Sequence, residues 1–380
     1  MTDSDAGKAQ VPTPPATISF ARGAPSTDIV DVDGLKEAAI AAFESDPAGV
    51  TGYGTAIGYV PLRRWIAGQH GVSEDHVLVT NGSMQADAFL FDEFVRPGTH
   101  VLTERPTYDR TLLGLRERGG EVHMVTLHED GIDVAEVESL LASGVRPALA
   151  HVIPNFQNPA GYTLSLAKRE RLLQIAREYE FLLFEDDPYV DVRFSGEPLP
   201  RMLELDGGVD SRHVVYASSF SKTICPGIRV GYLVGPADVI DRIRVRATNT
   251  YIAPSMLAQG TVYQYVTGDR FPVALEQVKT ALSERARVLD AALREHLPQA
   301  TFRRPEGGYF LWVSLPRDEG HVAARIVEEA AARGVIIVPG TDFVLEGGEN
   351  SFRLAYSGVT ADVIGEGVRR LAEAITAARG

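Results

Sequence analysis

Short apolar runs alternate with helix-like segments through the middle of this chain, and this alternation restricts the possible folds most. The runs lie at residues 77–80, 100–104, 148–154, 181–186, 213–218 and 229–235. Between two of them, residues 165–180 place Leu166, Leu172, Leu173 and Ile175 among charged residues, which is typical of an amphipathic helix. Strands that alternate with helices favour a mainly parallel sheet with helices on both faces.

The last hundred residues carry the pattern of a second, smaller α/β unit. Apolar runs at 309–316, 335–340 and 352–357 accompany amphipathic helices at 320–333 and 360–378. Residues 1–16 are rich in Pro, Thr, Ser and Asp, which predicts a flexible tail. Because no linker-like tract separates the two units, we expect them to be interleaved along the chain.

The composition excludes several classes of partner. The net charge is −14, which argues against nucleic acid and anionic membranes, although a small anionic ligand needs only local positive charge. A single cysteine, Cys225, excludes a disulfide framework and a zinc site built from cysteines. The polar N-terminus is no signal peptide, and no run of about 18 apolar residues predicts a membrane span. We therefore expect a soluble, cytoplasmic protein.

Polar residues follow the first three of these strands, at the edge where open parallel sheets bind ligands. "NGSMQ" at 81–85 leads into a helix, so it is either an anion site or an ordinary turn capped by Ser83. Tyr108 follows the next strand, as part of a site or as a rim residue. Asn158 follows the third, where its amide either binds a ligand or satisfies its own backbone.

The fourth strand is followed by Asp186 and, three residues later, Tyr189. A carboxylate at the mouth of a buried strand needs a cationic partner or several hydrogen-bond donors. The spacing allows Asp186 and Tyr189 to reach one ligand. The alternative is an acidic loop whose carboxylates accept hydrogen bonds from nearby groups of the protein and bind no ligand.

The fifth strand leads into "SFSK" at 219–222, and Arg229 follows seven residues later. The hydroxyls of Ser219 and Ser221 with a guanidinium suit a phosphate group. Lys222 has two possible interpretations. In an apolar pocket its pKa would be lowered and it would form a Schiff base; the alternative is an ordinary surface lysine in a loop. Five strand ends therefore offer an anion site, an aromatic face, an amide, a carboxylate and a lysine, as pyridoxal phosphate requires.

The chain resembles the fold-type I pyridoxal-phosphate enzymes, class I/II aminotransferases, and within them the 2-aminoadipate (LysN-like) and kynurenine aminotransferase II branch. The motifs that carry the resemblance are "TGYGTAIGYVPLRRWIA" (51–67), "TNGSMQ" (80–85), "RPTYD" (105–109), "IPNFQNPAG" (153–161), "FEDDPY" (184–189), "SSFSKTICPGIRVGYL" (218–233), "RPEGGYFLWVSLP" (304–316) and "SFRLAYS" (351–357). Their order and spacing agree with the family over residues 17–378.

The resemblance implies an aspartate aminotransferase-like fold, with a mainly parallel seven-stranded sheet in the large domain and a smaller α/β C-terminal domain. It implies an N-terminal segment, 17–45, that packs near the small domain and the substrate. The large domain would span 46–275 and the small domain 276–380.

The resemblance also implies the roles of the site residues. Lys222 would form the aldimine with pyridoxal 5'-phosphate and carry the substrate proton, and Asp186 would pair with the ring nitrogen. Tyr189 and Asn158 would hydrogen-bond the phenolic oxygen, and Tyr108 would stack on the ring. The remaining cofactor contacts would come from Ser83, the Met84 backbone, Ser219, Ser221 and Arg229, which hold the phosphate.

The substrates implied are an L-amino acid and a 2-oxo acid, with 2-oxoglutarate as the expected acceptor. Arg353 would bind the substrate α-carboxylate, and Gly23 would border the substrate. Tyr53 would reach the phosphate of a neighbouring subunit, which implies a homodimer.

Several positions depart from the family pattern. The segment before "ISF" is short, so aminoadipate specificity is not supported. "FARG" replaces "FAGG", so Arg22 either binds an acidic group or is solvated, and Met84 replaces a glutamine. Cys225 is expected to be a small buried apolar residue.

Other functions remain as alternatives to amino-group transfer. Elimination, γ-replacement or cyclisation in specialised biosynthesis is one, because fold alone does not decide the reaction. A DNA-binding regulator is a further alternative, against which the short N-terminus and acidic charge argue.

Overall fold

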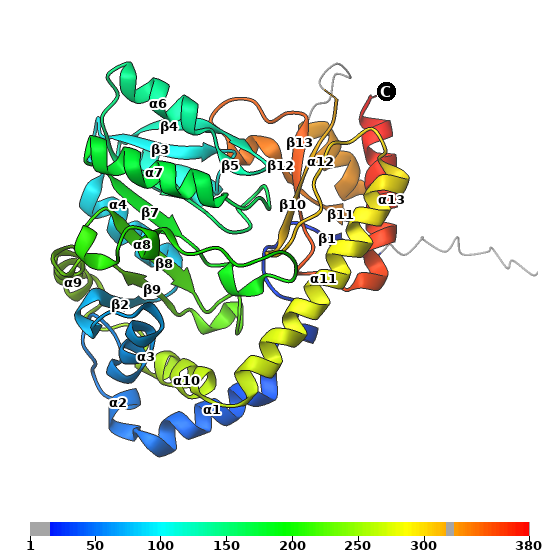
Figure 1. Ribbon diagram of the computed structural model, residues 1–380. Helices are drawn as coiled ribbons and strands as arrows, with labels where there is room; N and C mark the ends of the chain where they lie inside the picture. The colour runs from blue at the N-terminus through cyan, green and yellow to red at the C-terminus, as the bar shows by residue number, and fades with distance from the viewer. Residues whose placement is uncertain (1–15, 317–322, 380) are drawn as a thin grey trace, which may run out of the picture.

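The computed structural model describes residues 16–316 and 323–379, so the predicted tail lies outside the described residues except for Ala16. The larger part of the molecule is built around one sheet (Figure 1), with strand order β2-β9-β8-β7-β6-β3-β4-β5. Its strands are β2 (Val77–Thr80), β3 (His100–Arg105), β4 (Glu121–His128), β5 (Gly131–Ile132), β6 (Pro147–Val152), β7 (Leu182–Asp186), β8 (Val214–Ser219) and β9 (Gly231–Val234). The predicted α/β architecture with a mainly parallel sheet is confirmed.

Two strands of this sheet run against the others. β9 pairs antiparallel with both β2 and β8, and β5 pairs antiparallel with β4. β5 is an eighth strand beyond the seven that were expected. It forms because the chain turns back tightly between His128 and Gly131, and Gly131 adopts a φ of 110° that favours glycine.

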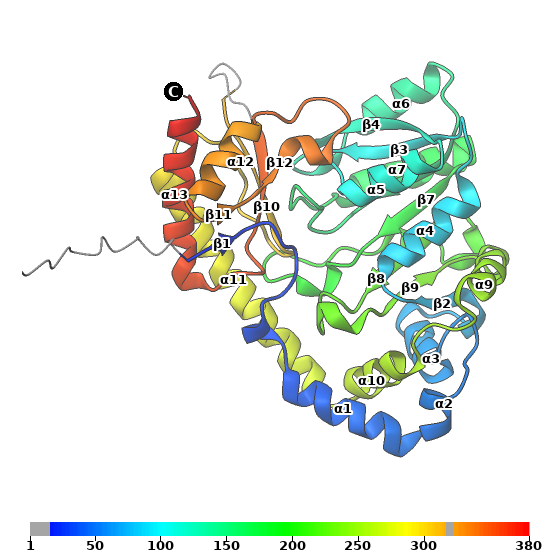
Figure 2. The same cartoon turned by 180° about the vertical axis from the view of Figure 1, so that it is seen from behind.

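Helices cover both faces of the large sheet, as Figures 1 and 2 show from opposite sides. One face packs against α4 (Ser83–Phe94), α5 (Asp109–Glu117) and α9 (Ala237–Tyr251). The other face packs against α3 (Val60–His70), α6 (Val134–Ala142), α7 (Leu166–Tyr179), α8 (Met202–Leu205) and α10 (Met256–Thr267). Successive strand residues therefore enter different cores: Leu183 faces one, while Leu182 and Phe184 face the other.

The smaller unit contains an antiparallel sheet of order β10-β13-β12 and a parallel pair, β1 with β11. The strands are β1 (Ile18–Ser19), β10 (Phe310–Ser314), β11 (Val335–Ile336), β12 (Val338–Pro339) and β13 (Ser351–Ala355). The helices are α11 (Arg270–His296), α12 (Ala323–Ala332) and α13 (Ala361–Arg379). β1 thus brings the start of the described chain into the small unit, beside the C-terminal helix (Figure 2).

The remaining helices, α1 (Val32–Ser45) and α2 (Pro47–Thr51), lie along α10 at one end of the large unit. α11 is continuous over 27 residues and connects this end with the small unit. The predicted domain boundary at 275/276 therefore falls inside a helix. The division into domains stays a prediction.

Sequence reasoning missed the two-residue strands β1 and β5 and one long strand, β4. Its sequence, "EVHMVTLH", alternates polar and apolar residues, and only Val125 is fully buried. A search for apolar runs finds strands that are buried on both faces and overlooks such a strand.

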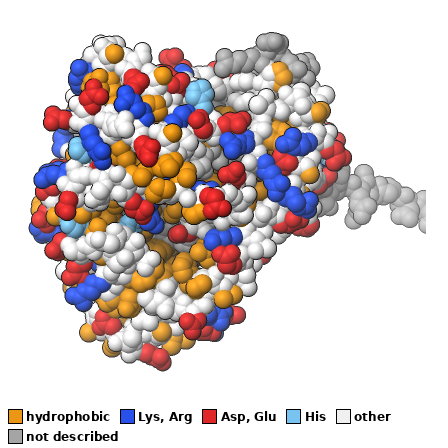
Figure 3. All heavy atoms as spheres, viewed as in Figure 1, with side chains coloured by type: hydrophobic (Ala, Val, Ile, Leu, Met, Phe, Trp, Pro, Cys, Tyr) orange, Lys and Arg blue, Asp and Glu red, His pale blue; other side chains and the backbone are white. Residues whose placement is uncertain are grey.

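The surface carries mixed charge. On the face in Figure 3, basic and acidic side chains are interspersed over both units. Among the residues that the structure describes, no helix is long and apolar enough to cross a membrane.

Candidate active site

A cavity of about 500 Å³ opens where the carboxyl ends of the large sheet's strands face the small unit. The predicted site residues that line it are Arg22, Gly23, Ser83, Met84, Tyr108, Asn158, Asp186, Tyr189, Ser219, Ser221, Lys222, Arg229 and Arg353. Tyr53 does not line it, and 94% of this residue is exposed in the single chain. The other predicted residues are therefore brought together around one space.

Lys222 lines this cavity and directs its amine toward Gly23 and two tyrosine rings. Its Nζ donates a hydrogen bond to the carbonyl of Gly23 at 3.0 Å, and it lies 5.5 Å from the ring centroids of Tyr189 and Tyr309. Burial, followed by the charges of Arg229 and Arg353, lowers the pKa of Lys222 to about 8, against the opposing effect of Asp186. Lys222 thus lines the cavity and does not lie on the outer surface, and a lowered pKa favours the uncharged, nucleophilic form of its amine.

An anion site forms where α4 begins. Gly82, with a φ of 88°, caps this helix, so Ser83 is its first residue and not its cap. Arg229 Nη1 donates to Ser221 Oγ at 3.2 Å, and the Ser221 N–H donates to Ser219 Oγ at 3.2 Å. A Cβ on Gly82 would lie 2.3 Å from Arg229 Nη2, so only glycine lets the guanidinium approach the helix N-terminus. Free N–H groups, hydroxyls and a guanidinium together suit a phosphate.

Asp186 is a buried carboxylate with one oxygen free. Its Oδ2 lies 3.4 Å from His151 Nε2, while its Oδ1 has no hydrogen-bond partner among the described residues. A second buried carboxyl, Asp87 of α4, lies nearby, and burial together with the Asp186 charge raises its pKa well above the usual value. A free buried carboxylate oxygen needs an N–H donor, and the N–H of a pyridinium ring fits that need.

Arg353 of β13 is held in place on two sides. Its Nη1 donates to Asn158 Oδ1 at 2.9 Å and its Nη2 to the carbonyl of Ala21 at 2.7 Å. Its guanidinium carbon lies 4.4 Å and 4.8 Å from the ring centroids of Phe310 and Phe343. Asn158 therefore orients this arginine and does not satisfy its own backbone. The guanidinium is fixed where it can bind a carboxylate.

Aromatic residues complete the walls. Tyr108 precedes the first residue of α5 and donates through its hydroxyl to Met84 Sδ at 3.8 Å. Burial and the Asp109 charge raise the pKa of Tyr108 to about 12, so it stays a neutral donor. Arg22 is exposed and lines the cavity, so both interpretations of its role stay open.

Sequence reasoning missed several residues of this site. His151 sits within the otherwise apolar run "ALAHVIP", and its polarity there was the signal. Asp87 falls four residues after Ser83, on the same face of α4. The Tyr309 hydroxyl donates to the Lys222 carbonyl at 2.6 Å and fixes that backbone. Cys225 is half-buried and packs against the core, and burial raises its pKa.

Known proteins are similar to this chain in sequence and in fold. The profile of the family "Aminotransferase class I and II" matches residues 16–371. The 2-aminoadipate transaminase of Thermus thermophilus is 33% identical, over 95% of this chain and 90% of its own length. The aromatic-amino-acid aminotransferase 1 of Thermococcus litoralis is 30% identical, over 94% of this chain and 88% of its own length.

A solved structure confirms the expected fold. LysN, the α-aminoadipate aminotransferase of Thermus thermophilus, superposes with a TM-score of 0.90 at 32% identity, over 95% of this chain and 92% of its own. That structure contains N-(5'-phosphopyridoxyl)-L-leucine, an adduct of the cofactor with an amino acid. The predicted cofactor is therefore confirmed as pyridoxal phosphate. The chain belongs to the class I and II aminotransferases, enzymes that transfer amino groups with this cofactor.

Proposed function

We propose that the chain transfers the amino group of an L-amino acid to a 2-oxo acid, with 2-oxoglutarate as the acceptor, and that Lys222 carries the reaction. The observation that supports this most is the position of the Lys222 amine. It shares one cavity with an anion site at Arg229, a free carboxylate at Asp186 and an oriented guanidinium at Arg353. A phosphate, a ring nitrogen and a substrate carboxylate thus each have a matching partner around one amine.

The cofactor contacts follow from the chemistry of each group. Pyridoxal phosphate supplies an aldehyde that binds amines and a pyridinium ring that accepts the electron pair left on the substrate Cα. We assign the ring nitrogen to Asp186, and the phosphate to Ser83, the Met84 N–H, Ser219, Ser221 and Arg229. Tyr108 would stack on the ring, and Asn158 and Tyr189 would donate to its phenolic oxygen.

Lys222 performs the proton transfer. Because its pKa is lowered to about 8, roughly a tenth of the amine is uncharged at pH 7 and about half at pH 8. An uncharged Nζ can take the proton from the substrate Cα and return it elsewhere. Its contact with the Gly23 carbonyl holds the side chain within the cavity.

Arg353 positions the substrate. Its two Nη atoms are directed by Asn158 and the Ala21 carbonyl, so the guanidinium does not have to be ordered when the substrate binds. A guanidinium binds a carboxylate through two parallel hydrogen bonds, which fixes the orientation of the Cα. Gly23 lies at this end of the cavity, and Arg22 is proposed to lie near the substrate side chain.

We also propose that two copies form a homodimer in which Tyr53 reaches the phosphate of the other subunit. Tyr53 is 94% exposed in the single chain, so its side chain is available to contact a second copy. A cytoplasmic location and a biosynthetic role stay predictions from the sequence. Transamination is favoured over elimination or replacement chemistry, since the relatives are named as aminotransferases.

The experiment is a half-reaction screen. Purified holoenzyme is mixed with each amino acid in turn, including aromatic amino acids, 2-aminoadipate and leucine, and the visible cofactor band is followed. We expect a donor to convert it to the amino form of the cofactor, and 2-oxoglutarate to restore it.

Borohydride reduction followed by peptide mass spectrometry locates the attachment, which we expect at Lys222 only. Lys222→Ala is expected to lose both the borohydride-sensitive band and turnover. Release of an unsaturated product without the amino form would contradict transamination, and attachment at another lysine would contradict the role of Lys222.

A further inference from the structure

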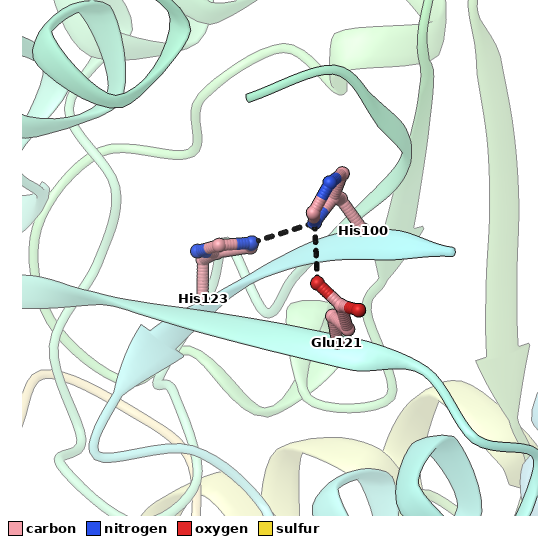
Figure 4. A group of neighbouring side chains, drawn as sticks. All are labelled: His100, Glu121 and His123. Atoms are coloured by element: carbon pink, nitrogen blue, oxygen red, sulfur yellow. Dashed lines mark hydrogen bonds and ion pairs between the residues drawn. The ribbon is translucent and has the colours of Figure 1, made fainter. Parts of the chain in front are cut away.

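Three metal-ligating side chains meet at the edge of the large sheet that lies opposite the cavity. They are His100, the first residue of β3, and Glu121 and His123, the first and third residues of β4 (Figure 4). Because β3 and β4 run parallel, their amino ends lie together at this edge, while their carboxyl ends point toward the active site. The group is therefore separate from the residues of transamination.

The strand register brings the three side chains to one face. His100 pairs with Glu121 across the two strands, and Leu102 pairs with His123. Side chains alternate between faces along a strand, so Glu121 and His123, two residues apart, share a face. His100 lies directly opposite Glu121 and projects to that same face.

The spacing of the donor atoms matches a coordination shell. His100 Nδ1 lies 3.0 Å from His123 Nε2 and 3.2 Å from Glu121 Oε2, and all three donor atoms fall within 4.8 Å of one another. In a tetrahedral zinc site with bonds of about 2.0–2.1 Å, neighbouring ligand atoms lie about 3.3 Å apart. The two shortest separations are already close to this value.

We propose that His100, Glu121 and His123 form a site for a borderline divalent metal ion such as Zn²⁺. Two imidazoles and one carboxylate are a common ligand set for this class of ion. Mg²⁺ and Ca²⁺ prefer oxygen ligands and bind imidazole poorly. The His100 side chain is 34% and the Glu121 side chain 59% exposed, so an ion reaches the site from solvent and water fills the fourth position.

Binding needs only a local change in protonation. The contact between the two imidazoles requires a proton on one of the facing nitrogens, since two lone pairs would repel. On binding, that proton moves to the other nitrogen of its own ring, and both facing nitrogens become ligands. The ion then joins β3 to β4 at the point where the two strands begin.

Equilibrium dialysis of Zn²⁺ against tag-free holoenzyme, without amino acid substrate, tests the proposal. We expect one saturable site per chain and a melting temperature that rises with Zn²⁺. His123→Ala and Glu121→Gln should each weaken binding at least tenfold and abolish the rise, because each loses a ligand. Mg²⁺ should give neither effect.

His128→Ala is the matched control. His128 lies on the same strand, is 52% exposed at its side chain and contacts a single carboxylate, that of Asp133, at 3.1 Å. The His128→Ala variant should bind Zn²⁺ as tightly as the unaltered protein does. An unchanged visible cofactor band shows that each variant is folded. The proposal is overturned if the unaltered protein shows no saturable binding below about 100 μM Zn²⁺, or if the His123 and Glu121 variants bind like the control.

Discussion

The two ends of the active-site cavity are built in different ways. The cofactor end draws on strand ends and turns of one sheet: Ser83 follows β2, Asp186 ends β7 and Ser219 ends β8. The substrate end joins distant segments, since Arg353 of β13 binds the Ala21 carbonyl, 332 residues away. Most of the first end is built from the large unit, with Gly23 and Tyr309 contacting Lys222, whereas the second end needs the two units packed together.

This difference separates affinity for the cofactor from affinity for the substrate. Groups on adjacent strands of the large sheet are held in position relative to one another by that sheet. Arg353 lies in the small unit and Gly23 in the N-terminal segment, so their positions relative to the sheet depend on the packing between the units. Substitutions at the two ends should therefore change different measured quantities.

Arg353→Leu should have the largest effect. In the proposed role, it removes two charge-assisted hydrogen bonds to the substrate carboxylate, each worth about 1.5–3 kcal/mol, so kcat/KM should fall about 10²- to 10⁴-fold. Affinity for pyridoxal phosphate should stay the same. Steady-state kinetics and apoenzyme titration measure the two quantities.

Arg353→Lys keeps the charge and loses the planar fork, so it should recover part of the activity. A fall in cofactor affinity as large as the fall in kcat/KM would break the separation of the two ends.

Asp186→Ala should have the next largest effect. The free Oδ1 of Asp186 is our proposed partner of the cofactor nitrogen, and removal of one such electrostatic partner costs about 10²- to 10³-fold in kcat. The phosphate contacts remain, so the visible band should persist while single-turnover conversion slows. The kcat of Asp186→Glu should lie between those of Asp186→Ala and the unaltered enzyme. If Asp186→Ala turned over like the unaltered enzyme, the pairing would be wrong.

Much of the cofactor end could be predicted from the sequence, because Ser83, Asp186 and Ser219 lie at the ends of strands that meet at one edge of the sheet. Arg229 instead precedes β9, which runs antiparallel to its neighbours. Lys222, Asp186 and Arg229 all lie in the one cavity that the strand ends indicate. The partners of Arg353 could not be predicted, since the approach of Ala21 and Asn158 depends on how the two units pack. His151 was missed for a different reason: a single polar residue inside a buried run does not reveal which neighbour it meets.

Arg229→Gln should weaken cofactor binding about 10- to 100-fold, by the loss of one charge-assisted interaction with the phosphate. Ser221 and Ser219 keep their mutual contact, so the cradle is weakened and not destroyed. The KM for the amino donor should not change at saturating cofactor. Dissociation constants from apoenzyme titration check this, and an unchanged constant would remove Arg229 from the phosphate site.

The pH dependence of reconstitution tests the amine where the two ends meet. Burial first, and then Arg229 and Arg353, lower the pKa of Lys222 to about 8, against the opposing charge of Asp186. The uncharged amine is the reactive form, so the rate of cofactor capture by apoenzyme should rise about tenfold from pH 7 to pH 9 and then level off. A rate that still rises in proportion above pH 9 would indicate an ordinary lysine.

Gly23→Ala should have the smallest effect on kinetics, and that effect should be confined to the substrate end of the cavity. A Cβ at Gly23 would lie 2.4 Å from Phe310 Cζ, so the ring must move, and this ring packs on the Arg353 guanidinium. A repacking cost of about 1 kcal/mol corresponds to a donor KM that rises about fivefold, with cofactor affinity unchanged. Gly227→Ala is the control, because a Cβ there meets no atom within 4 Å in the loop of the cofactor end. Equal KM values for the two variants would mean that the substrate end tolerates displacement of Phe310, and its dependence on close packing between the units would then be refuted.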